Sequence, residues 1–379
     1  MFVRFGSLYA GKIGALTGRT LLYLCEKDHD VQPHNTFDIF QDGYGENLYV
    51  CNYQLLKMWK RVFSTRKRVF LLDGIAKYFF TFCNRFLIRT DHIIATTRGE
   101  HDVLNLIGKS IIYLKFTEEE VSRAESEMKR MDIARNDSYV CMLNRSQDYL
   151  EKTFPLANCD HNSFRSCSID NYMPAAEEMT KRGHHVIRMG SIVGDLMNTD
   201  NPKIIEYAHW GYRTELLDIY LSAHCYFFIS CGSGLDEVPW AFKKPVVYVN
   251  FHHLEYINSF SPNFITIFRK HWLEKENRFM SVQEIIESGA GRCQTTEQYE
   301  DMGIKLIENT PEEIIDVVDE MDKRLKGIWQ TTEEDEERQS HFWSFFKSSD
   351  LHGVINARVG AKFLRQNLIF ENESHAKTS

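Results

Sequence analysis

The segment from Cys225 to Asn250 constrains the fold of this chain more than any other. It begins with an apolar, aromatic run of strand type, continues through a Gly/Ser turn and a short helical stretch, and ends with a second apolar run at 246–250. Two strands joined through a helix run in the same direction, which is the repeating unit of a parallel sheet. The segment therefore predicts an α/β domain whose ligands lie beyond the carboxyl ends of its strands.

The same alternation of strands and helices runs through most of the chain. The expected strands are 1–6, 36–40, 139–143 and 185–189, and the expected helices are 118–130, 171–182 and 215–223, with another running from the glycine loop at 11–18 to about residue 26. Thr310, followed by Pro311 and two glutamates, is typical of a helix start, with threonine as the N-cap and proline at the first helical position.

The length predicts two domains with a cleft between them, because 379 residues exceed one ordinary core. Asn136 and Asp137 precede an apolar run and mark a loop that enters a strand. We place a domain boundary there, which gives domains over 1–135 and 136–350, followed by a C-terminal helix and frayed tail over 351–379.

Composition excludes several classes of protein. The nine cysteines are scattered singly, which argues against a zinc site and against a secreted disulfide framework. The net charge of −8 argues against nucleic-acid binding as the main function. No run of about 18 apolar residues is long enough to span a membrane, and the first residues lack a secretion signal. We therefore expect a cytoplasmic protein.

The turn after the strand at 225–230 is the sharpest candidate for a ligand site. Ser230, Gly232, Ser233 and Gly234 allow close approach of the backbone to a ligand, and the helix that follows would point its free N–H groups at a diphosphate. A purely structural turn is the alternative. Glu237, in the first turn of that helix, either binds a ribose diol or caps the helix.

Three arginines are expected at the same edge. Arg188 ends a strand just before Gly190, Arg145 ends the preceding strand, and Arg165 lies in the loop between them. A planar guanidinium there can hold phosphate oxygens bidentately, although a salt bridge is the alternative. Together they would neutralise a leaving nucleoside diphosphate, which is the role of a metal ion in other sugar transferases.

Metal chemistry finds little support in the sequence. The adjacent histidines at 184–185 and 252–253 would point to opposite faces of a strand, and no DxD triplet is present. His161 is a candidate general acid or base, and a structural loop histidine is the alternative.

Residues 57–89 combine basic and aromatic side chains with a single acid, Asp73. This mixture suits a surface that rests on anionic lipid head groups, which would place the protein at the inner face of the membrane. The alternative is that the aromatic residues are core and the charges are solvated.

Residues 139–365 resemble a family of putative bacterial glycosyltransferases associated with surface-polysaccharide genes. The likeness lies in the strings Asn171-Tyr-Met-Pro-Ala-Ala, Gly183-His-His-Val-Ile-Arg-Met-Gly190, Ser230-Cys-Gly-Ser-Gly-Leu and Lys244-Pro-Val-Val-Tyr-Val-Asn250. It implies a GT-B-like fold of two Rossmann-like domains, with the acceptor bound by the N-terminal one and the donor by the C-terminal one. It also implies donor contacts for Arg165, Arg188 and the loop 230–234. In the family an Asp follows the arginine that corresponds to Arg145, whereas here Ser146 follows it and Asp148 comes later.

These observations lead to the expectation of a metal-independent glycosyltransferase. It would move a sugar from a nucleotide-sugar donor to a glycan or lipid-linked acceptor, with Arg145, Asp148, His161 and Arg165 as catalytic candidates and no cofactor besides the co-substrate. A nucleotide-sugar 2-epimerase and a non-catalytic nucleotide or glycan binder are the alternatives.

Overall fold

The computed structural model describes residues 2–42, 49–72, 91–97, 99–146, 160–192, 194–346 and 349–367, apart from the side chains of 160–162. The chain forms two compact units. Unit 1 comprises residues 1–135, 213–224 and 233–244, and unit 2 comprises 136–212, 225–232 and 245–379. The first boundary between the units lies between Arg135 and Asn136, and the segments 213–224 and 233–244 group with unit 1 although they come later in the chain.

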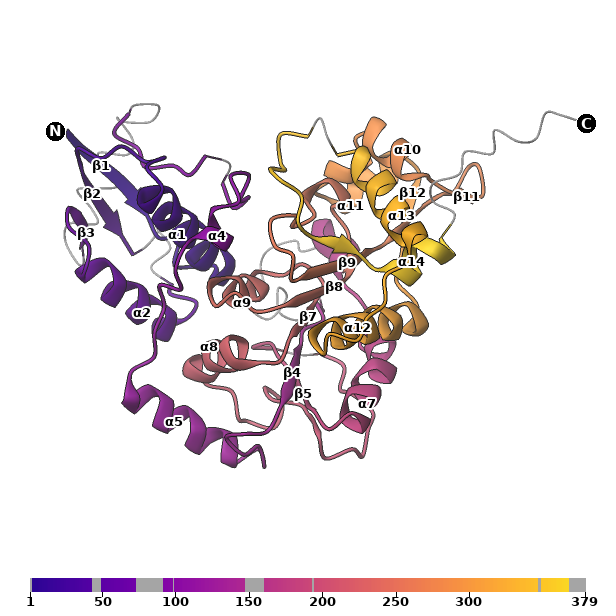
Figure 1. The fold of residues 1–379 in the computed structure, drawn as a ribbon, viewed down its shortest axis with the longest axis horizontal. Coiled ribbons are helices and arrows are strands. Elements are labelled where there is room, and N and C mark those ends of the chain that lie inside the picture. Colours follow the sequence, from indigo (N-terminus) through magenta and orange to yellow (C-terminus); the bar gives the residue numbers. More distant parts are fainter. Residues whose placement is uncertain are drawn as a thin grey trace, which may run out of the picture. The chain divides into compact units, whose positions relative to one another are not determined.

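Unit 1 is built on a three-stranded parallel sheet in the order β1-β2-β3. Its strands are β1 (Phe2–Ser7), β2 (Thr36–Gln41) and β3 (Val69–Leu72), and its helices are α1 (Ile13–Asp28), α2 (Tyr53–Ser64), α4 (Leu106–Lys109), α5 (Glu118–Lys129), α8 (Glu215–His224) and α9 (Glu237–Ala241), the last preceded by the 3₁₀ turn η3 (Gly234–Asp236). Helix α1 packs against α4 and α9, and α2 packs against β3 and α8 (Figure 1).

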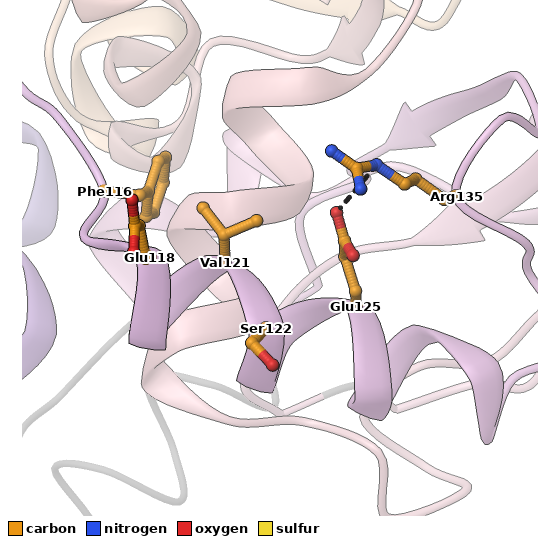
Figure 2. Close-up of a pocket in the computed structure, with 6 residues that line it drawn as sticks. All are labelled: Phe116, Glu118, Val121, Ser122, Glu125 and Arg135. Carbon is orange, nitrogen blue, oxygen red and sulfur yellow. Dashed lines mark ion pairs between the residues drawn. The ribbon is translucent and has the colours of Figure 1, made fainter.

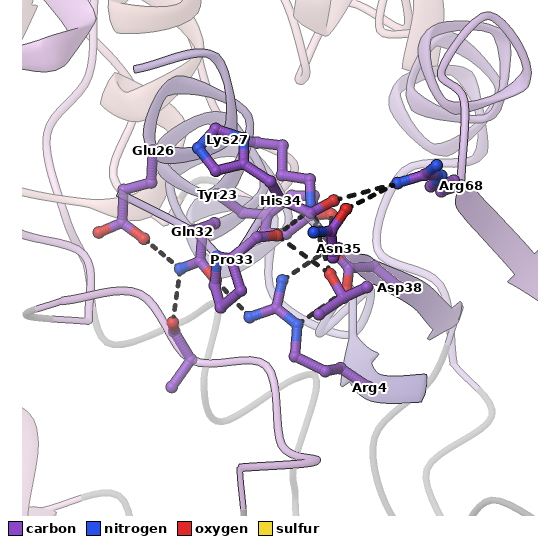
Figure 3. Close-up of polar contacts among 12 residues, drawn as sticks. Arg4, Tyr23, Glu26, Lys27, Gln32, Pro33, His34, Asn35, Asp38 and Arg68 are labelled. Carbon is purple, nitrogen blue, oxygen red and sulfur yellow. Dashed lines mark hydrogen bonds and ion pairs between the residues drawn. The ribbon is translucent and has the colours of Figure 1, made fainter. Parts of the chain in front are cut away.

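A buried ionic network joins β1 to β2 (Figure 3). Arg4 and Asp38 are register partners on the two strands. The Arg4 guanidinium donates to both Asp38 oxygens at 2.8 and 2.7 Å, and Tyr23 and Lys27 of α1 donate to the same carboxylate. Although burial alone would raise the pKa of Asp38, hydrogen bonds from Arg4, Tyr23 and Lys27 leave it below its ordinary value. The network is paired and hydrogen-bonded, as a buried charge must be, and its role is structural.

Unit 2 contains a seven-stranded parallel sheet in the order β13-β9-β8-β7-β4-β5-β6. Its strands are β4 (Tyr139–Met142), β5 (His185–Arg188), β6 (Ile204–Ile205), β7 (Phe228–Ser230), β8 (Val246–Phe251), β9 (Phe264–Phe268) and β13 (Arg358–Val359). All six residues of β8 are buried, as expected of a parallel strand covered on both faces. The sequence prediction of an α/β fold with a parallel sheet is confirmed.

Helices cover this sheet and cap its connections. The helices of unit 2 are α7 (Met173–Lys181), α10 (Val282–Glu287), α11 (Thr296–Asp301), α12 (Pro311–Leu325), α13 (Glu333–Ser344) and α14 (Ala361–Gln366), with the 3₁₀ turns η1 (Asp160–Arg165), η2 (Asp170–Tyr172), η4 (Leu254–Tyr256) and η5 (Ala290–Arg292). Helix α7 packs on β5, α12 packs on β8 and β9, and the two helices contact each other (Figure 1). Thr310 caps α12 as predicted, since its hydroxyl accepts from the Glu313 N–H and the Glu313 carboxylate accepts from the Thr310 N–H.

A small antiparallel sheet is added at the end of β9. It consists of β11 (Arg278–Phe279), β10 (Lys270–Leu273) and β12 (Ile304–Ile307), in that order. Only Arg269 separates β9 from β10, so this one residue lies at the junction of the two sheets.

Candidate functional site

The order of the strands in unit 2 marks one edge of the large sheet as a ligand site. The chain runs outward from β4 through β5 to β6 and then returns to place β7 on the other side of β4. In open parallel sheets, ligands bind beyond the carboxyl ends of the strands at the point where the strand order reverses. Arg145 follows β4 and Gly232 follows β7, so both lie at this point.

Arg145 is a partly buried cation. Burial lowers the pKa of its guanidinium, which measures the cost of taking the charge out of water. Among the residues that the structure describes, no aspartate or glutamate forms an ion pair with it. Buried charges in proteins are normally paired, and an anionic ligand would supply the missing partner here.

Arg165 reaches the same edge from the end of η1. Its Nη2 donates to the carbonyl of Gly232 at 3.0 Å. The turn is held from the other side, where the hydroxyl of Ser163 contacts that of Thr296 at 3.0 Å. The structure therefore brings Arg145, Arg165 and Gly232 together at the ends of β4 and β7.

Sequence reasoning missed a third arginine, Arg269. Its side chain is 4% exposed, and it donates to the carbonyls of Phe164 at 2.7 Å and Ser166 at 2.5 Å. No described carboxylate pairs with it either. It follows β9 directly, but the sequence analysis predicts no strand at 264–268, so the strand-end argument that selected Arg145 and Arg188 did not reach it.

Two histidines after β8 complete the cluster. Burial lowers the pKa of His252 well below its usual value, and the positive charges of Arg165, Arg269 and Arg145 lower it further. Burial likewise lowers the pKa of His253 to about 3. Both rings are therefore neutral at physiological pH. Neither ring nitrogen of His252 has a hydrogen-bond partner among the described residues, so the ring has a donor and an acceptor to offer a ligand.

Two buried cysteines lie behind the arginines. Cys167 receives a hydrogen bond from the thiol of Cys231, and this bond, against the effect of burial, lowers the pKa of Cys167 to about 7. The hydroxyl of Tyr172 lies 3.3 Å from the Cys167 sulfur and lowers that pKa further, as does the charge of Arg269. The positive charges of the cluster thus contribute to the lowered pKa values of His252, His253 and Cys167.

The loop after β7 differs from the expected helix N-terminus. Gly232 has φ +78° and lies so close to Phe251 that a Cβ would come within 3.0 Å of the ring, which explains the glycine. The N–H of Ser233 is already bonded to the carboxylate of Asp236, and the helix after it has only five residues. The prediction that Ser233, Gly234 and a helix dipole face a diphosphate is therefore corrected, because the helix is too short and its first donor is occupied. Ser230 is fully buried beneath the loop.

Arg188 is a core residue in this structure rather than a side chain turned toward a ligand. It is 1% exposed and donates to Glu206 Oε1 at 2.9 Å, to Asn144 Oδ1 at 3.1 Å and to the carbonyl of Asp195 at 2.5 Å. Its fork is thus used within the protein, which is the salt-bridge alternative in buried form. Gly190 follows with φ +133°, a backbone conformation that glycine adopts readily.

The position of Glu237 matches neither of the two roles expected for it, a ribose contact or a helix cap. Its carboxyl group packs against α1, where a Cβ on Gly14 or Gly18 would come within 2.6 or 1.8 Å of its oxygens. Burial raises the pKa of Glu237 well above its ordinary value, and the charges of Glu100 and Asp236 raise it further. Oε2 has no hydrogen-bond partner among the described residues.

The remaining candidates are only partly described. Asp148 and the side chain of His161 lie outside the described residues, so their predicted roles stay predictions. No group of three or more His, Cys, Asp or Glu side chains in the described part of the chain is arranged to hold a metal ion. Within the same part, no helix has the length and apolar character needed to cross a membrane.

The basic stretch at 57–89 is described only up to residue 72. In that part Trp59 and Phe63 are buried, and Arg61 donates to both oxygens of Glu120 at 2.6 and 2.8 Å. Lys60 lies 3.5 Å from Asp42. The described part thus agrees with the alternative that the aromatic residues are core, and the rest of the stretch lies outside the described residues.

A surface hollow of about 330 Å³ lies on α5 of unit 1 (Figure 2). It is lined by Phe116, Glu118, Val121, Ser122, Glu125 and Arg135. Arg135 and Glu125 pair across it at 3.1 Å, so its main charges are already matched. We assign no chemistry to it.

Comparisons with known proteins give distant likenesses only. No protein-family model and no curated protein matches the chain. A family 9 glycosyl transferase from Veillonella parvula DSM 2008 is 11% identical, with 65% of this chain and 79% of that chain covered and a TM-score of 0.38. The iron-containing dodecameric glycosyltransferase TibC from enterotoxigenic E. coli H10407 is 12% identical, with 66% and 58% covered and a TM-score of 0.35. The E. coli heptosyltransferase WaaC, solved with ADP, is 11% identical, with 78% and 99% covered and a TM-score of 0.34. Likenesses this distant leave the function to be argued from the chain's own residues.

Proposed function

We propose that this protein is a nucleotide-sugar-dependent glycosyltransferase of the GT-B type that binds the diphosphate of its donor at the ends of β4 and β7. The observation that carries the proposal is the guanidinium of Arg145, which is desolvated at the strand-order reversal without a described carboxylate partner. Arg165 and Arg269 add two more cations close by, and the neutral His252 adds a hydrogen-bonding ring. A diphosphate has the charge and the oxygen geometry that such a cluster binds.

In this proposal the arginines act on the leaving group. When the bond between the sugar and the diphosphate breaks, negative charge grows on the phosphate oxygen that leaves. Arg145 and Arg165 would face that charge from fixed positions in a partly buried site, where electrostatic stabilisation is strongest. The acceptor, a glycan or a lipid-linked sugar of a surface polysaccharide, would be bound with the participation of unit 1. Contact of residues 57–89 with anionic membranes belongs to the same proposal, and co-sedimentation with phosphatidylserine vesicles at low salt tests it.

Nucleotide binding is the first test. A thermal-shift screen against ADP, GDP, UDP and their sugar conjugates should show stabilisation of about 2.7 kcal/mol at 100 times the dissociation constant. Arg145→Gln should raise the Kd of the best nucleoside diphosphate about ten- to hundredfold, since a charge-assisted hydrogen bond contributes about 1.5–3 kcal/mol.

Arg292→Gln is the matched control, because Arg292 is a partly exposed arginine of unit 2 that pairs with Glu255 at 2.7 Å. Its Kd should stay within about twofold of the wild type, because Arg292 is not one of the arginines of the proposed cluster. Absence of any nucleotide shift, or equal Kd values for the wild type and Arg145→Gln, would remove the proposed site. Incubation of the protein with a nucleotide sugar alone then separates the alternatives, since an epimerase converts the sugar and a transferase leaves it intact or hydrolyses it slowly.

A further inference from the structure

Arg269 holds the backbone on both sides of Arg165. Its Nη1 donates to the carbonyl of Phe164 at 2.7 Å, and its Nη2 donates to the carbonyl of Ser166 at 2.5 Å. The two acceptors are the residues immediately before and after Arg165 in the sequence. A single planar fork thus fixes the end of η1 where Arg165 leaves it.

Arg269 is itself held firmly in place. Its own N–H donates to the carbonyl of Phe251 at the end of β8 at 2.9 Å, and its position between β9 and β10 ties it to both sheets of unit 2. Arg165, by contrast, lies on a 3₁₀ turn of six residues, and such turns are short and weakly held by their own hydrogen bonds. Arg269, which the sheets hold in place, therefore orients Arg165, which lies on the weakly held turn.

A purely structural brace would not require a buried positive charge. Two carbonyls can be satisfied by neutral donors, and a buried cation without a carboxylate partner is costly. In the described part of the chain Arg269 has no such partner, and its Nε has no hydrogen-bond acceptor. An anion bound beside Arg269 would compensate its charge, and this explains why a charged side chain occupies position 269.

We propose that Arg269 is a positioning residue of the donor site, which sets the direction of Arg165 and adds a third positive charge that selects a diphosphate over a monophosphate. This inference rests on the proposed function. A nucleoside diphosphate carries about one more negative charge than the monophosphate, and that extra charge gains most from a third nearby cation. Arg269 acts through Arg165 and through its field, without a required contact to the ligand.

A double-mutant cycle on nucleotide binding tests the proposal. The probes are UDP, ADP and GDP with their monophosphates, and the proteins are the wild type, Arg165→Gln, Arg269→Gln and the double variant, measured by calorimetry at fixed salt. Each single variant should raise the Kd of the best diphosphate about tenfold. If Arg269 works through Arg165, Arg269→Gln should add less than about threefold in the Arg165→Gln background, because contacting residues are not additive. The diphosphate-to-monophosphate preference should fall in each variant.

The variant Arg269→Lys separates positioning from folding. Lysine keeps the charge but not the fork, so it should retain more of the diphosphate preference than Arg269→Gln while binding more weakly than the wild type. Arg292→Gln again serves as the control and should leave both measures unchanged.

Three results would overturn the proposal. These are additive effects in the cycle, an unchanged Kd in Arg269→Gln with only a lower melting temperature, and failure of both Arg269 variants to fold, which would make the residue part of the core. Failure of the proposed function has a different signature, since the wild type itself would then bind none of the six nucleotides.

Discussion

Arginine residues in this protein differ in whether a carboxylate faces them. Arg188 is paired with Glu206 at 2.9 Å and Arg4 with Asp38 at 2.7 Å, and both side chains are buried. Arg145 and Arg269 are also withdrawn from water, but no described acid pairs with either. A buried arginine that pairs with a carboxylate has its charge compensated within the protein. A buried arginine without a carboxylate partner has a charge that a bound anion can compensate. The distinction places Arg188 in the core and is the reason why the proposed site includes the other two.

Arg188 should therefore affect stability and not nucleotide affinity. Arg188→Met removes one partner of a buried ion pair and leaves Glu206 without compensation, which typically costs about 3–5 kcal/mol. We expect urea unfolding to show a loss of this order, while the folded fraction binds the best nucleoside diphosphate with unchanged Kd. Glu206→Gln is the matched variant and should destabilise the fold by a similar amount, because it leaves the buried guanidinium of Arg188 without a carboxylate partner. A folded Arg188→Met protein with a tenfold weaker Kd would return Arg188 to the donor site.

Glu237 should make stability depend on pH. Burial raises its folded-state pKa above the ordinary value of 4.5, so the folded state favours the protonated carboxyl group. The stabilisation is complete below pH 4.5 and is lost as the pH rises toward the folded-state pKa, by up to about 1.4 kcal/mol per pH unit within that window. Glu237→Gln keeps the shape without the charge, so its stability relative to the wild type should increase with pH in thermal melts from pH 4.5 upward. Glu119→Gln, an exposed change on α5, should show no such trend.

At the scale of elements, many of the regular strands and helices were predicted from the sequence, whereas α2, β3, β9 and the shortest strands were not. The strands β1, β2, β4, β5, β7 and β8 and the helices α1, α5, α7, α8 and α12 lie where apolar periodicity and capping residues place them. Periodicity says nothing about a short edge strand such as β13, or about the two- to four-residue strands of the small antiparallel sheet. These elements are too short to show a pattern and depend on tertiary pairing.

The candidate site was predictable to a similar degree. The argument from strand ends selected Arg145 and Arg165, and in the structure Arg165 donates to the carbonyl of Gly232 at the same end of the sheet. The same logic named Arg188, because sequence alone does not reveal that Glu206, 18 residues away, would pair with it. Glu237 was placed on the correct helix, but its packing on α1 depends on Gly14 and Gly18, which are more than 200 positions away in the sequence.

The contact between α1 and α9 makes a prediction at the scale of elements. A Cβ on Gly18 would lie 1.8 Å from Glu237 Oε2, and the three nearest atoms that it would meet all belong to Glu237. Gly18→Ala should therefore destabilise the wild type. In a Glu237→Ala background the obstacle is absent, and the same change should stabilise the helix by about 0.5–1 kcal/mol, the usual gain of alanine over glycine in a helix interior. Chemical denaturation of the four proteins measures this reversal of sign, and a cost that is equal in both backgrounds would show that the glycine serves another contact.

For the whole molecule, each compact unit has its own parallel sheet, and the chain passes between the units several times. Residues 213–224 and 233–244 interrupt the sequence of unit 2 and belong to unit 1. The chain enters unit 1 after β7, between Gly232 and Ser233, and leaves it just before β8, between Lys244 and Pro245, so the two units share this stretch of sequence. Sequence periodicity does not show this sharing, because it reports the local direction of the chain and not which unit a helix packs against.

The last prediction concerns the whole reaction and its dependence on metal ions. A leaving nucleoside diphosphate must be neutralised, and sugar transferases achieve this with a divalent cation or with fixed protein cations. Here the proposed cations are Arg145, Arg165 and Arg269, so wild-type nucleotide affinity and donor turnover should be unchanged within about twofold in excess EDTA. Arg145→Gln leaves the site short of one positive charge, and magnesium or manganese should then restore part of its lost affinity for the diphosphate, which the metal can coordinate together with water. Isothermal titration of both proteins with the nucleoside diphosphate, with and without magnesium, measures the metal independence of wild-type binding and the metal rescue of Arg145→Gln. Loss of wild-type binding in EDTA, with recovery on adding the metal, would show that the arginines do not suffice and that a metal-bound diphosphate is the true ligand.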